Sequence, residues 1–388
     1  MRVKVDFNEL SNALSYANTV LSDKSVDEKS KNFIFNISNE ELYIIGYSAF
    51  IFTRIAIENW EILEPIPDDG WKFQVKASEM NKIITSFSSL SLTKVDGFYL
   101  YDDGVRIGVE VEEVAIEEDK YPNLSQTVSF FLENSSITGK VLMEINTEFP
   151  EDDAELLNSG DLFLYLDTLS PIMSNDVSSS LASKMNFADE YVFVVSSSMA
   201  AFMPNKLPEA LKGFALTYSS ISFLKKVCST TEEDIGTSIA KTSNYLCLHM
   251  GNIEAFMKYQ KIKVKYQIYM DRRKTDNGVK VSRFYLKDVL KRMGSLSPDG
   301  KVEVLEDGSI RVENSNFNQI IPTNKVKGEV SGINFNVSIP ILEKVILGAD
   351  EIYTEDLFIY FVPITRGYII FISDKSGSWY ANMQVTNA

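Results

Sequence analysis

The chain has 388 residues, of which 45% are hydrophobic, so it is long enough to bury the cores of two or three domains of ordinary size. No apolar run reaches membrane-spanning length, and the only cysteines, Cys228 and Cys247, do not form a disulfide framework, so we expect a protein of the reducing cytoplasm. The net charge of −16 argues against a surface coated with nucleic acid, unless basic residues gather on one face.

The first part of the chain predicts a β-α-β-β-β order that occurs twice. A strand at 3–7 precedes a helix that Asn8 can cap, and a second strand–helix unit begins at Phe73. The first helix is indicated by apolar residues at the spacing of one helical face, which are Leu10, Leu14, Ala17 and Leu21. The further strands expected here are 32–37, 42–45, 50–57, 92–95, 97–101 and 105–111.

The middle of the chain is less regular, and the last part is clearer. Asp161 to Leu166 predicts a strand, and a short helix carrying Leu169, Ile172 and Met173 is expected after it. In the last part, the pattern predicts a helix from Arg283 to Met293. The strands expected in these two parts are 186–187, 191–195, 279–281, 301–305, 309–313, 317–321, 351–362, 367–373 and 378–385.

One short pattern occurs three times. It begins at Phe73, Phe214 and Phe335, which are 141 and 121 residues apart. After each Phe, an aliphatic residue follows at +2, Ser or Pro at +5, and apolar residues at +7 and +10, so a strand runs into an amphipathic helix. The recurrence predicts three similar domains, at 1–125, 137–265 and 279–388, with linkers at 118–136 and 266–278.

Three segments resemble a known family. Tyr121-Pro122-Asn123-Leu124, Leu42 to Gly46, and Gly332 to Ser338 are similar to segments of the bacterial-type replicative DNA sliding clamp, the DNA polymerase III beta subunit. The resemblance implies an α+β fold of three tandem clamp domains, each a doubled βαβββ unit, with helices that line a pore and sheets outside. The match in the middle domain is the weakest, and such divergence would suit a bacteriophage version.

The resemblance implies a processivity factor, not an enzyme, that needs no cofactor or metal. It implies a homodimeric ring around double-stranded DNA of any sequence, which tethers a DNA polymerase and is loaded by a separate ATP-dependent clamp loader. Its location would be the cytoplasm, or the host cytoplasm for a phage protein. The alternative is a clamp-fold adaptor or structural protein that does not thread DNA, which the sparse basic residues of the first domain favour.

A sliding ring needs Lys and Arg that touch phosphates without reading bases. The spacing predicts Arg283, Lys287 and Lys291 along one helix stripe, with Arg292 beside it and Leu286, Leu290 and Met293 opposite. The same stripe is also typical of an ordinary solvated face. The weaker candidates are Lys24, Lys82, Lys225, Lys226 and Lys344. The first helix offers only Glu9 as a charged residue.

The resemblance also implies an apolar groove between the middle and third domains that accepts short motifs of the polymerase and the loader. The residues at matching positions are Ser196, Met199, Ala201, Asn336, Ile339, Met383, Gln384 and Val385. Methionine suits an adaptable apolar groove. Alternatively, Met383 and Val385 only complete an edge strand.

Catalytic sites are weakly indicated. His249 is the only histidine and is expected to be structural, and the pairs Asp68-Asp69, Asp102-Asp103 and Asp152-Asp153 are better explained as turn residues than as metal ligands. No GxxxxGK phosphate loop is present. The acidic run at 110–119 is expected to be an exposed strand edge and linker, which could repel DNA from an outer surface.

Overall fold

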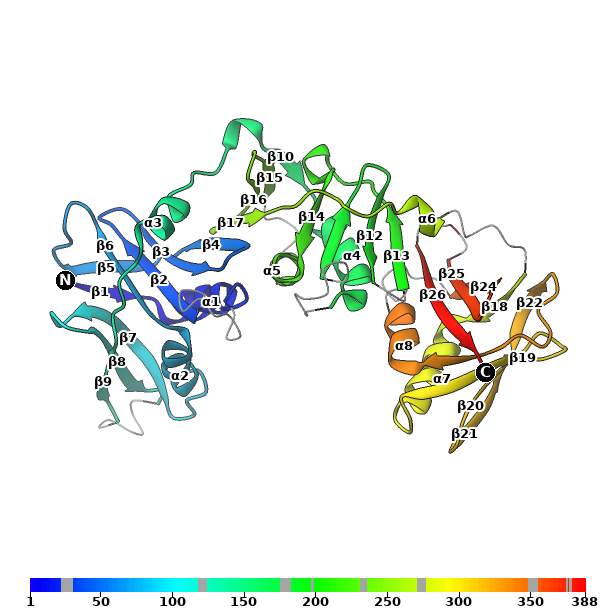
Figure 1. Cartoon of the computed structure of the whole chain (residues 1–388). Coiled ribbons are helices and arrows are strands. Elements are labelled where there is room, and N and C mark those ends of the chain that lie inside the picture. The colour runs from blue at the N-terminus through cyan, green and yellow to red at the C-terminus, as the bar shows by residue number, and fades with distance from the viewer. Residues whose placement is uncertain are drawn as a thin grey trace. The chain divides into compact units, whose positions relative to one another are not determined.

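The computed structural model describes residues 1–21, 31–117, 124–174, 183–196, 199–230, 236–270, 277–347, 355–374, 376 and 379–388. The chain forms two compact units (Figure 1). Unit 1 combines Met1–Leu157 with Thr230–Lys258, and unit 2 combines Asn158–Ser229 with Tyr259–Ala388. The middle predicted domain therefore contributes to both units. Lys24 and the segment Tyr121-Pro122-Asn123 lie outside the described residues.

Unit 1 contains an antiparallel sheet of five strands. In spatial order these are β5 (Trp60–Glu64), β1 (Arg2–Val5), β7 (Thr93–Asp102), β8 (Ile107–Ala115) and β9 (Gln126–Leu132). The two strands expected at 92–95 and 97–101 are one strand, β7, whose register shifts between Val95 and Gly97. β9 lies inside the predicted linker 118–136, yet it pairs along β8, so this part of the expected linker is sheet.

The acidic strand β8 is not an edge, because it lies between β7 and β9. Its carboxylates are engaged by neighbouring side chains: Arg2 pairs with Glu110, the hydroxyl of Tyr99 donates to Glu112 at 2.7 Å, and that of Thr93 donates to Glu113 at 2.7 Å. The expectation of an exposed acidic edge is therefore wrong for the part of the run in β8. Residues 118 and 119 lie outside the described residues.

A second sheet of unit 1 has eight strands. They are β10 (Glu155–Leu157), β15 (Thr237–Lys241), β16 (Tyr245–Met250), β17 (Ile253–Lys258), β4 (Ile51–Ala56), β3 (Leu42–Tyr47), β2 (Asn32–Ile37) and β6 (Trp71–Lys76). β17 pairs with β4, so strands of the middle and first repeats form one continuous ladder. This pairing explains why the middle repeat is divided between the two units.

The helices of unit 1 are α1 (Phe7–Asn18), α2 (Ala77–Phe87) and α3 (Gly139–Ile145), with a 3₁₀ turn at Glu151–Asp153. α1 begins earlier than predicted, because the carboxylate of Asp6, and not Asn8, accepts the backbone N–H of Glu9 at 2.8 Å. α3 follows the predicted first linker, at the start of the predicted middle domain, and packs Val141 and Ile145 into a core cluster of the eight-stranded sheet.

Unit 2 is built on one large antiparallel sheet. Its main path is β14 (Phe214–Thr217), β11 (Lys184–Phe187), β12 (Tyr191–Val195), β13 (Met199–Pro204), β26 (Tyr380–Asn387), β23 (Asn334–Ser338), β19 (Asp299–Val304), β20 (Ile310–Asn314) and β21 (Phe317–Ile321). The remaining strands are β18 (Gly278–Ser282), β22 (Thr323–Lys327), β24 (Asp356–Ile364) and β25 (Gly367–Ser373). β26 pairs with β13, so the middle and third repeats also share a ladder.

The helices of unit 2 are α4 (Ser159–Leu169), α5 (Tyr218–Thr230), α6 (Gln267–Met270), α7 (Arg283–Gly294) and α8 (Ile339–Leu347), with 3₁₀ turns at Ser170–Ile172 and Glu209–Leu211. The strand predicted at Asp161 to Leu166 is wrong, because these residues form α4. The side chain of Asn158 caps this helix by accepting from the backbone N–H of Asp161 at 3.1 Å. The short helix predicted to follow is only the 3₁₀ turn that contains Ile172.

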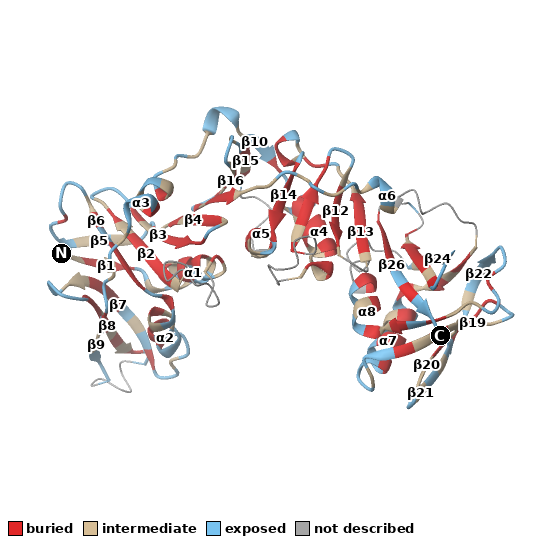
Figure 2. Cartoon of the chain, in the orientation of Figure 1, coloured by how far each residue is buried: buried red, intermediate tan, exposed pale blue. Residues whose placement is uncertain are grey.

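The threefold strand–helix pattern is confirmed. β6 runs into α2, β14 into α5, and β23 into α8, and each helix begins four residues after its Phe. Phe73, Phe214 and Phe335 are all buried, at 0–2% exposure. Figure 2 shows that buried residues concentrate in the strands. The pattern recurs because each strand places its Phe in a core that the following helix covers.

Candidate DNA-facing helices and partner groove

Helix α7 carries the main basic candidates. The hydroxyl of Ser282 caps it by accepting from the backbone N–H of Tyr285 at 3.4 Å. The side chains buried along its inner face are Leu286, Val289, Leu290 and Met293, which agrees with the predicted apolar face. Lys291 and Arg292 are exposed, and Lys287 is half-buried. The outer face of α7 therefore presents two exposed cations, with a third at its margin.

Arg283 does not belong to that outer face. Its side chain is 4% exposed, and its guanidinium carbon lies 4.5 Å from the ring centroid of Phe284. Residues four apart on a helix differ by about 40° in direction, so Arg283 and Lys291 differ by about 80°. The predicted single stripe is therefore wrong: it runs from the core at Arg283 to solvent at Lys291.

The other basic candidates differ in how exposed they are and in whether an acidic side chain pairs with them. Lys82 on α2 and Lys344 on α8 are exposed. Lys225 on α5 pairs with Asp167 of α4, and its ammonium also donates to the Ser170 hydroxyl at 3.3 Å. Lys226 is half-buried, and burial lowers its pKa. The exposed cations therefore concentrate on α7 and α8, which contact one another.

Helix α1 supplies no cation, as the sequence predicts. Its charged residue, Glu9, accepts from the backbone N–H groups of Glu58 at 2.9 Å and Asn59 at 3.1 Å. Burial alone would raise the pKa of Glu9, but these bonds and one from the Asn59 side chain lower it overall. Glu9 therefore anchors the start of α1 to the turn before β5.

The predicted groove residues gather along β26. Met199 lies opposite Met383, and Ala201 opposite Ala381, in the β13–β26 ladder. Asn336 of β23 lies opposite Thr386 and donates from its side chain to the Asn387 carbonyl at 3.2 Å. One edge of β26 thus passes from β13 to β23, and Gln384 and Val385 lie at the point of change.

Burial separates the groove candidates into two groups. The aliphatic members Ala201, Ile339, Met383 and Val385 are all at most 4% exposed, so they form core and not an open wall. Asn336 and Gln384 are exposed, and Ser196 and Met199 are half-buried. The alternative of an edge strand is also wrong, because β26 is paired on both sides, with β25 on one edge.

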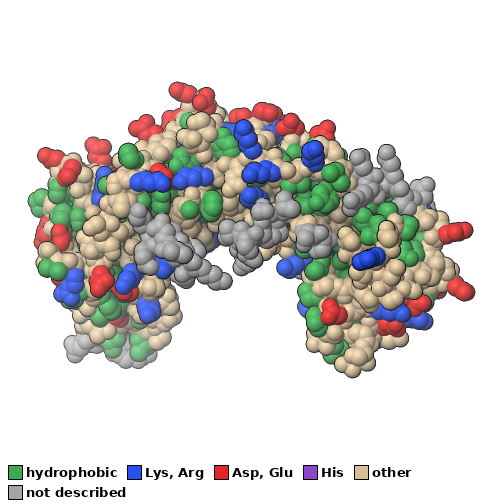
Figure 3. Space-filling view, in the orientation of Figure 1, with side chains coloured by type: hydrophobic (Ala, Val, Ile, Leu, Met, Phe, Trp, Pro, Cys, Tyr) green, Lys and Arg blue, Asp and Glu red, His purple; other side chains and the backbone are tan. Residues whose placement is uncertain are grey.

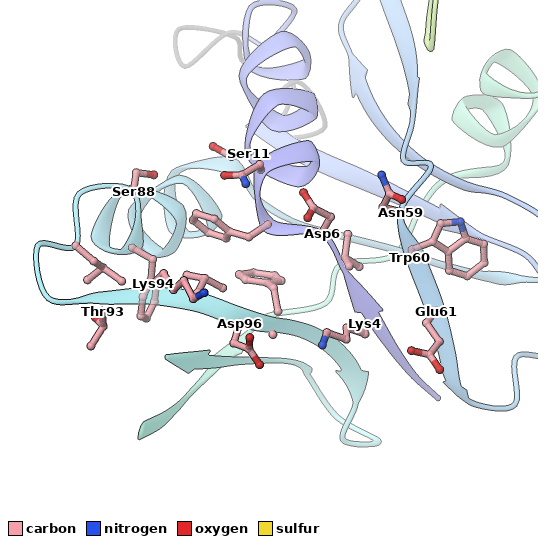
Figure 4. A pocket seen from close by; sticks show the side chains of 18 of the residues that line it. Lys4, Asp6, Ser11, Asn59, Trp60, Glu61, Ser88, Thr93, Lys94 and Asp96 are labelled. Atoms are coloured by element: carbon pink, nitrogen blue, oxygen red, sulfur yellow. The ribbon is translucent and has the colours of Figure 1, made fainter. Parts of the chain in front are cut away.

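The structure has one cavity beside the groove candidates and another in unit 1. A shallow one of about 610 Å³ includes Asn336 and Thr386 in its wall, beside Lys301 and Glu313. A larger one of about 810 Å³ lies in unit 1 between the start of α1, β5 and β7 (Figure 4). Lys4, Asp6, Trp60, Lys94 and Asp96 line it, and none of the predicted site residues does.

The catalytic candidates have structural contacts. The side chain of Asp102 accepts from the backbone N–H of Gly104 at 2.9 Å, and that of Asp103 from Val105 at 2.9 Å, as turn residues do. The His249 ring contacts the Phe149 ring and lies 3.0 Å from the Gly251 carbonyl oxygen. Within the described ranges, no three His, Cys, Asp or Glu side chains are placed to hold a metal ion, and no helix is long and apolar enough to cross a membrane.

The ion pair between Asp167 and Lys225 does not follow from the sequence analysis, which predicts a strand from Asp161 to Leu166. A helical signal is present in the sequence: Asn158 can cap, and Leu162, Tyr165, Leu166 and Leu169 have the i, i+3, i+4, i+7 spacing of one face. The continuous apolar run hides this spacing, because it fits either structure.

No family model and no curated protein matches this sequence. Solved structures do match it over its full length. The DNA polymerase III beta subunit of Thermotoga maritima is 15% identical, with a TM-score of 0.72 and 100% and 99% of the two chains covered. The chain has the sliding-clamp fold.

Two further structures agree. The Bacillus subtilis DNA polymerase sliding clamp is 11% identical with a TM-score of 0.76, and 100% of this chain and 99% of that chain are covered. The DNA polymerase III subunit beta of Pseudomonas aeruginosa is 13% identical with a TM-score of 0.73, and both chains are covered completely. The predicted resemblance and fold class are confirmed. Likeness at this identity establishes the fold and not the roles of single residues.

Proposed function

We propose that this chain is a DNA sliding clamp, a processivity factor that encircles duplex DNA and tethers a replicative DNA polymerase. The observation that carries the proposal is the full-length likeness to DNA polymerase III beta subunits, together with the strand–helix unit that recurs three times. Such a protein acts by topology and catalyses no reaction itself. It would work in the cytoplasm, where a separate ATP-dependent loader opens the ring.

DNA contact is proposed to come mainly from the third repeat. The surface of α7 and α8 offers Lys287, Lys291, Arg292 and Lys344 against the acidic Asp288 and Glu343. In the first repeat, α2 offers Lys82 beside Glu79. Flexible lysines that touch phosphates give binding without sequence preference, which a sliding ring requires.

A second copy of the chain is proposed to close the ring. β9 ends the five-stranded sheet and β21 ends the main path of the sheet in unit 2, so each has one unpaired edge in the described structure. Exposed apolar side chains accompany these edges: Phe131 on β9, Ile320 on β21, and Phe284 on α7. Pairing β9 of one copy with β21 of the other would cover both edges in a head-to-tail dimer.

The dimer is tested by light scattering at several concentrations. A species of twice 43.8 kDa is expected, and Phe131→Glu should convert it to monomer. Val105→Glu, at an exposed apolar position outside β9 and β21, is the matched control and should leave the mass unchanged. A wild-type protein that is monomeric at every concentration would contradict ring closure by these edges and favour the adaptor role.

DNA contact is tested by binding to a short duplex as a function of salt. Lys287→Glu with Lys291→Glu should weaken binding about tenfold or more and reduce the salt slope by about two. Lys261→Glu with Lys263→Glu makes the same charge change away from α7 and should have a smaller effect. Equal losses in both double variants would contradict a DNA surface on α7.

Partner motifs are proposed to bind where β26 passes from β13 to β23. Met199 and Gln384 are accessible there, while Met383 and Val385 form the floor. Met199→Glu should reduce the stimulation of the cognate polymerase on primed DNA and leave the dimer mass unchanged. Unchanged stimulation would place the polymerase contact elsewhere.

A further inference from the structure

The segment that follows β17 crosses the large sheet of unit 2 on the face lined by Phe193 and Phe202. Gln260 exchanges two backbone hydrogen bonds with Ala215 of β14, at 3.0 and 2.8 Å. Further along, the Tyr266 ring lies 5.1 Å from that of Phe193, and the Tyr269 ring 6.5 Å from that of Phe202. Figure 1 shows this segment in front of β14, β12 and β13, on its way to α6.

The side chains of this segment alternate between the sheet and solvent. Ile262, Val264 and Tyr266 pack against the core cluster that contains Phe193 and Phe202. The residues between them, Lys261, Lys263 and Lys265, are exposed. In an extended chain, alternate residues are about 6.6 Å apart, so the three lysines form a straight row on the outer side of the sheet. We call Lys261, Lys263 and Lys265 the lysine row.

The charge of the lysine row is not neutralised by the described part of the chain, where none of the three makes an ion pair. Lysines nearby in sequence or on the same unit behave differently: Lys258 pairs with Glu144, Lys212 with Glu209, and Lys225 with Asp167. Figure 3 shows Lys and Arg side chains gathered in the middle of the view, over the elements that the segment crosses. In a chain of net charge −16, this row is therefore a local concentration of positive charge.

The backbone of the same segment is also unpaired. From Lys261 to Val264, no N–H or C=O group hydrogen-bonds to the described residues, and the next contact is the Lys265 carbonyl, which accepts from Ile268 at 3.3 Å. The alternation of exposed and half-buried side chains fits an extended chain, and no strand of the described residues pairs with it from Lys261 to Val264. Such a backbone can pair with an added strand.

We propose that residues 261–265 bind an acidic, extended segment of a protein partner by strand addition. Carboxylates at alternate positions of an added strand repeat at the spacing of the lysine row, and cross-strand pairs bring their Cβ atoms to about 4.5–5.5 Å. Hydrogen bonds between the two backbones align the partner segment with residues 261–265, and the lysine row selects acidic side chains. This binding goes beyond the clamp function, since it requires neither DNA nor a closed ring.

The surroundings favour a peptide over single-stranded nucleic acid. Nucleic-acid sites of this kind stack bases on aromatic faces. Here Tyr266 packs against Phe193 and, in a T-shaped contact at 5.9 Å, against Tyr191, so its ring is engaged. Its hydroxyl donates to Glu190 at 3.2 Å, which places a carboxylate at the end of the row. A short peptide can end before Glu190, whereas a continuous phosphate backbone would pass it.

The test uses the full chain and a labelled synthetic peptide in which Glu and Thr alternate. A peptide of the same composition with its Glu residues clustered controls for charge alone. An oligothymidylate tests whether the lysine row binds single-stranded nucleic acid instead. Lys261→Glu, Lys263→Glu and Lys265→Glu are combined in one variant. Lys291→Glu, Arg292→Glu and Lys344→Glu, all exposed on α7 and α8, make the matched variant with the same charge change.

At low salt, the alternating peptide should bind wild type, and the lysine-row variant should bind it about tenfold more weakly, as expected for the loss of three exposed ion pairs. The matched variant should change by less than about twofold. N-methylation of the peptide backbone along one edge should also reduce binding. Circular dichroism and thermal melting confirm that each variant is folded.

Four results would overturn the proposal: no binding of the alternating peptide to wild type, equal losses in both triple variants, equal binding of the clustered peptide, or tighter lysine-row-dependent binding of oligothymidylate. The last result would identify the row as a nucleic-acid contact. None of these results depends on ring closure, so they are distinguishable from a failure of the clamp function.

Discussion

Two places in the molecule join the strands of one repeat to those of the next, and they are stabilised by different chemistry. In unit 1, β17 pairs with β4 from Ile253↔Ile55 to Met257↔Ile51. In unit 2, β13 pairs with β26 from Met199↔Met383 to Phe202↔Tyr380. A connecting segment covers each ladder: α3, which begins just after the predicted first linker, covers the first, and the segment with Tyr266 and α6 covers the second.

The first junction combines aromatic rings with charges. Arg54 and Glu254 lie opposite one another in the ladder, and the Arg54 Nε donates to Glu254 at 2.8 Å. The guanidinium carbon also lies 5.1 Å from the centroid of the Phe256 ring. Glu144 of α3 accepts from the Tyr47 hydroxyl at 2.7 Å and from the Lys258 ammonium at 3.2 Å. Helix α3 is thus held to the sheet by a charged carboxylate that accepts from a hydroxyl and an ammonium group.

The second junction is apolar and centres on aromatic rings. The rings of Phe202 and Tyr380 stack at 5.5 Å across the ladder, and Phe193 lies 5.5 Å from Phe202 on the next strand. Tyr266 and Tyr269 of the linker complete the cluster. Apolar burial tolerates changes of pH and salt, whereas an ion-paired junction depends on every partner being present and charged. Both junctions join the strands of two repeats, but we expect the stability of the first to depend more strongly on pH and salt than that of the second.

The largest effect should come from the aromatic junction. Phe202→Ala removes a fully buried ring that contacts Phe193, Tyr269 and Tyr380, and should lower the free energy of unfolding by about 3–5 kcal/mol. Hydrogen exchange should show the loss in β13 and β26, with β4 and β17 unaffected. Phe202→Leu is the conservative control. A loss under about 1 kcal/mol would contradict a junction held by ring packing.

The ionic junction should show a smaller loss that can be restored. Arg54→Ala leaves Glu254 partly buried without its partner and should cost about 2–3 kcal/mol, since neither side chain is fully buried. Replacing both residues by Met should recover most of this loss, because paired apolar side chains avoid the desolvation of two ions. Urea unfolding measures all three proteins. A double variant as unstable as Arg54→Ala would indicate that charge, and not packing, is required here.

The smallest effect should be a pH dependence confined to the first junction. Burial raises the pKa of Glu144, but the hydrogen bonds from Tyr47 and Lys258 and the charge of Lys258 lower it overall. A carboxylate with a depressed folded-state pKa stabilises the fold above its ordinary pKa, and this contribution disappears as the pH falls through the folded-state value. Exchange protection of β17 should therefore weaken below about pH 4.5.

Glu144→Gln separates this effect from general acid unfolding. It should cost about 1–2 kcal/mol at neutral pH, through weaker hydrogen bonds, and should flatten the acid dependence at β17. β13 and β26 serve as the internal control, because their aromatic cluster is uncharged. Identical acid profiles for Glu144→Gln and wild type would exclude Glu144 as the source of the pH dependence.

Both cysteines are buried in apolar surroundings. Cys247 lies in the core cluster under α3, and Cys228 is buried on α5. Burial raises the pKa of each thiol to about 12. At neutral pH both remain protonated, and a buried thiol is a poor nucleophile.

Features that depend on local periodicity can be predicted from the sequence alone. The three Phe-initiated strand–helix units, the apolar face of α7 and the turn at Asp102-Asp103 are each encoded within a few residues. A strand or helix that buries one face repeats its apolar residues every 2 or 3.6 positions, and this period is visible without knowledge of the partner surface.

The remaining features depend on contacts between residues that are distant in sequence. The apolar run in α4 fits either period, and its Asn158 cap and the packing around it select the helix. Arg283 is drawn into the core by the helical turn, and β26 becomes a central strand because β13, 184 residues earlier at Met199↔Met383, pairs with it. Contacts between residues so distant in sequence leave no local pattern, since each partner only has to be apolar or extended.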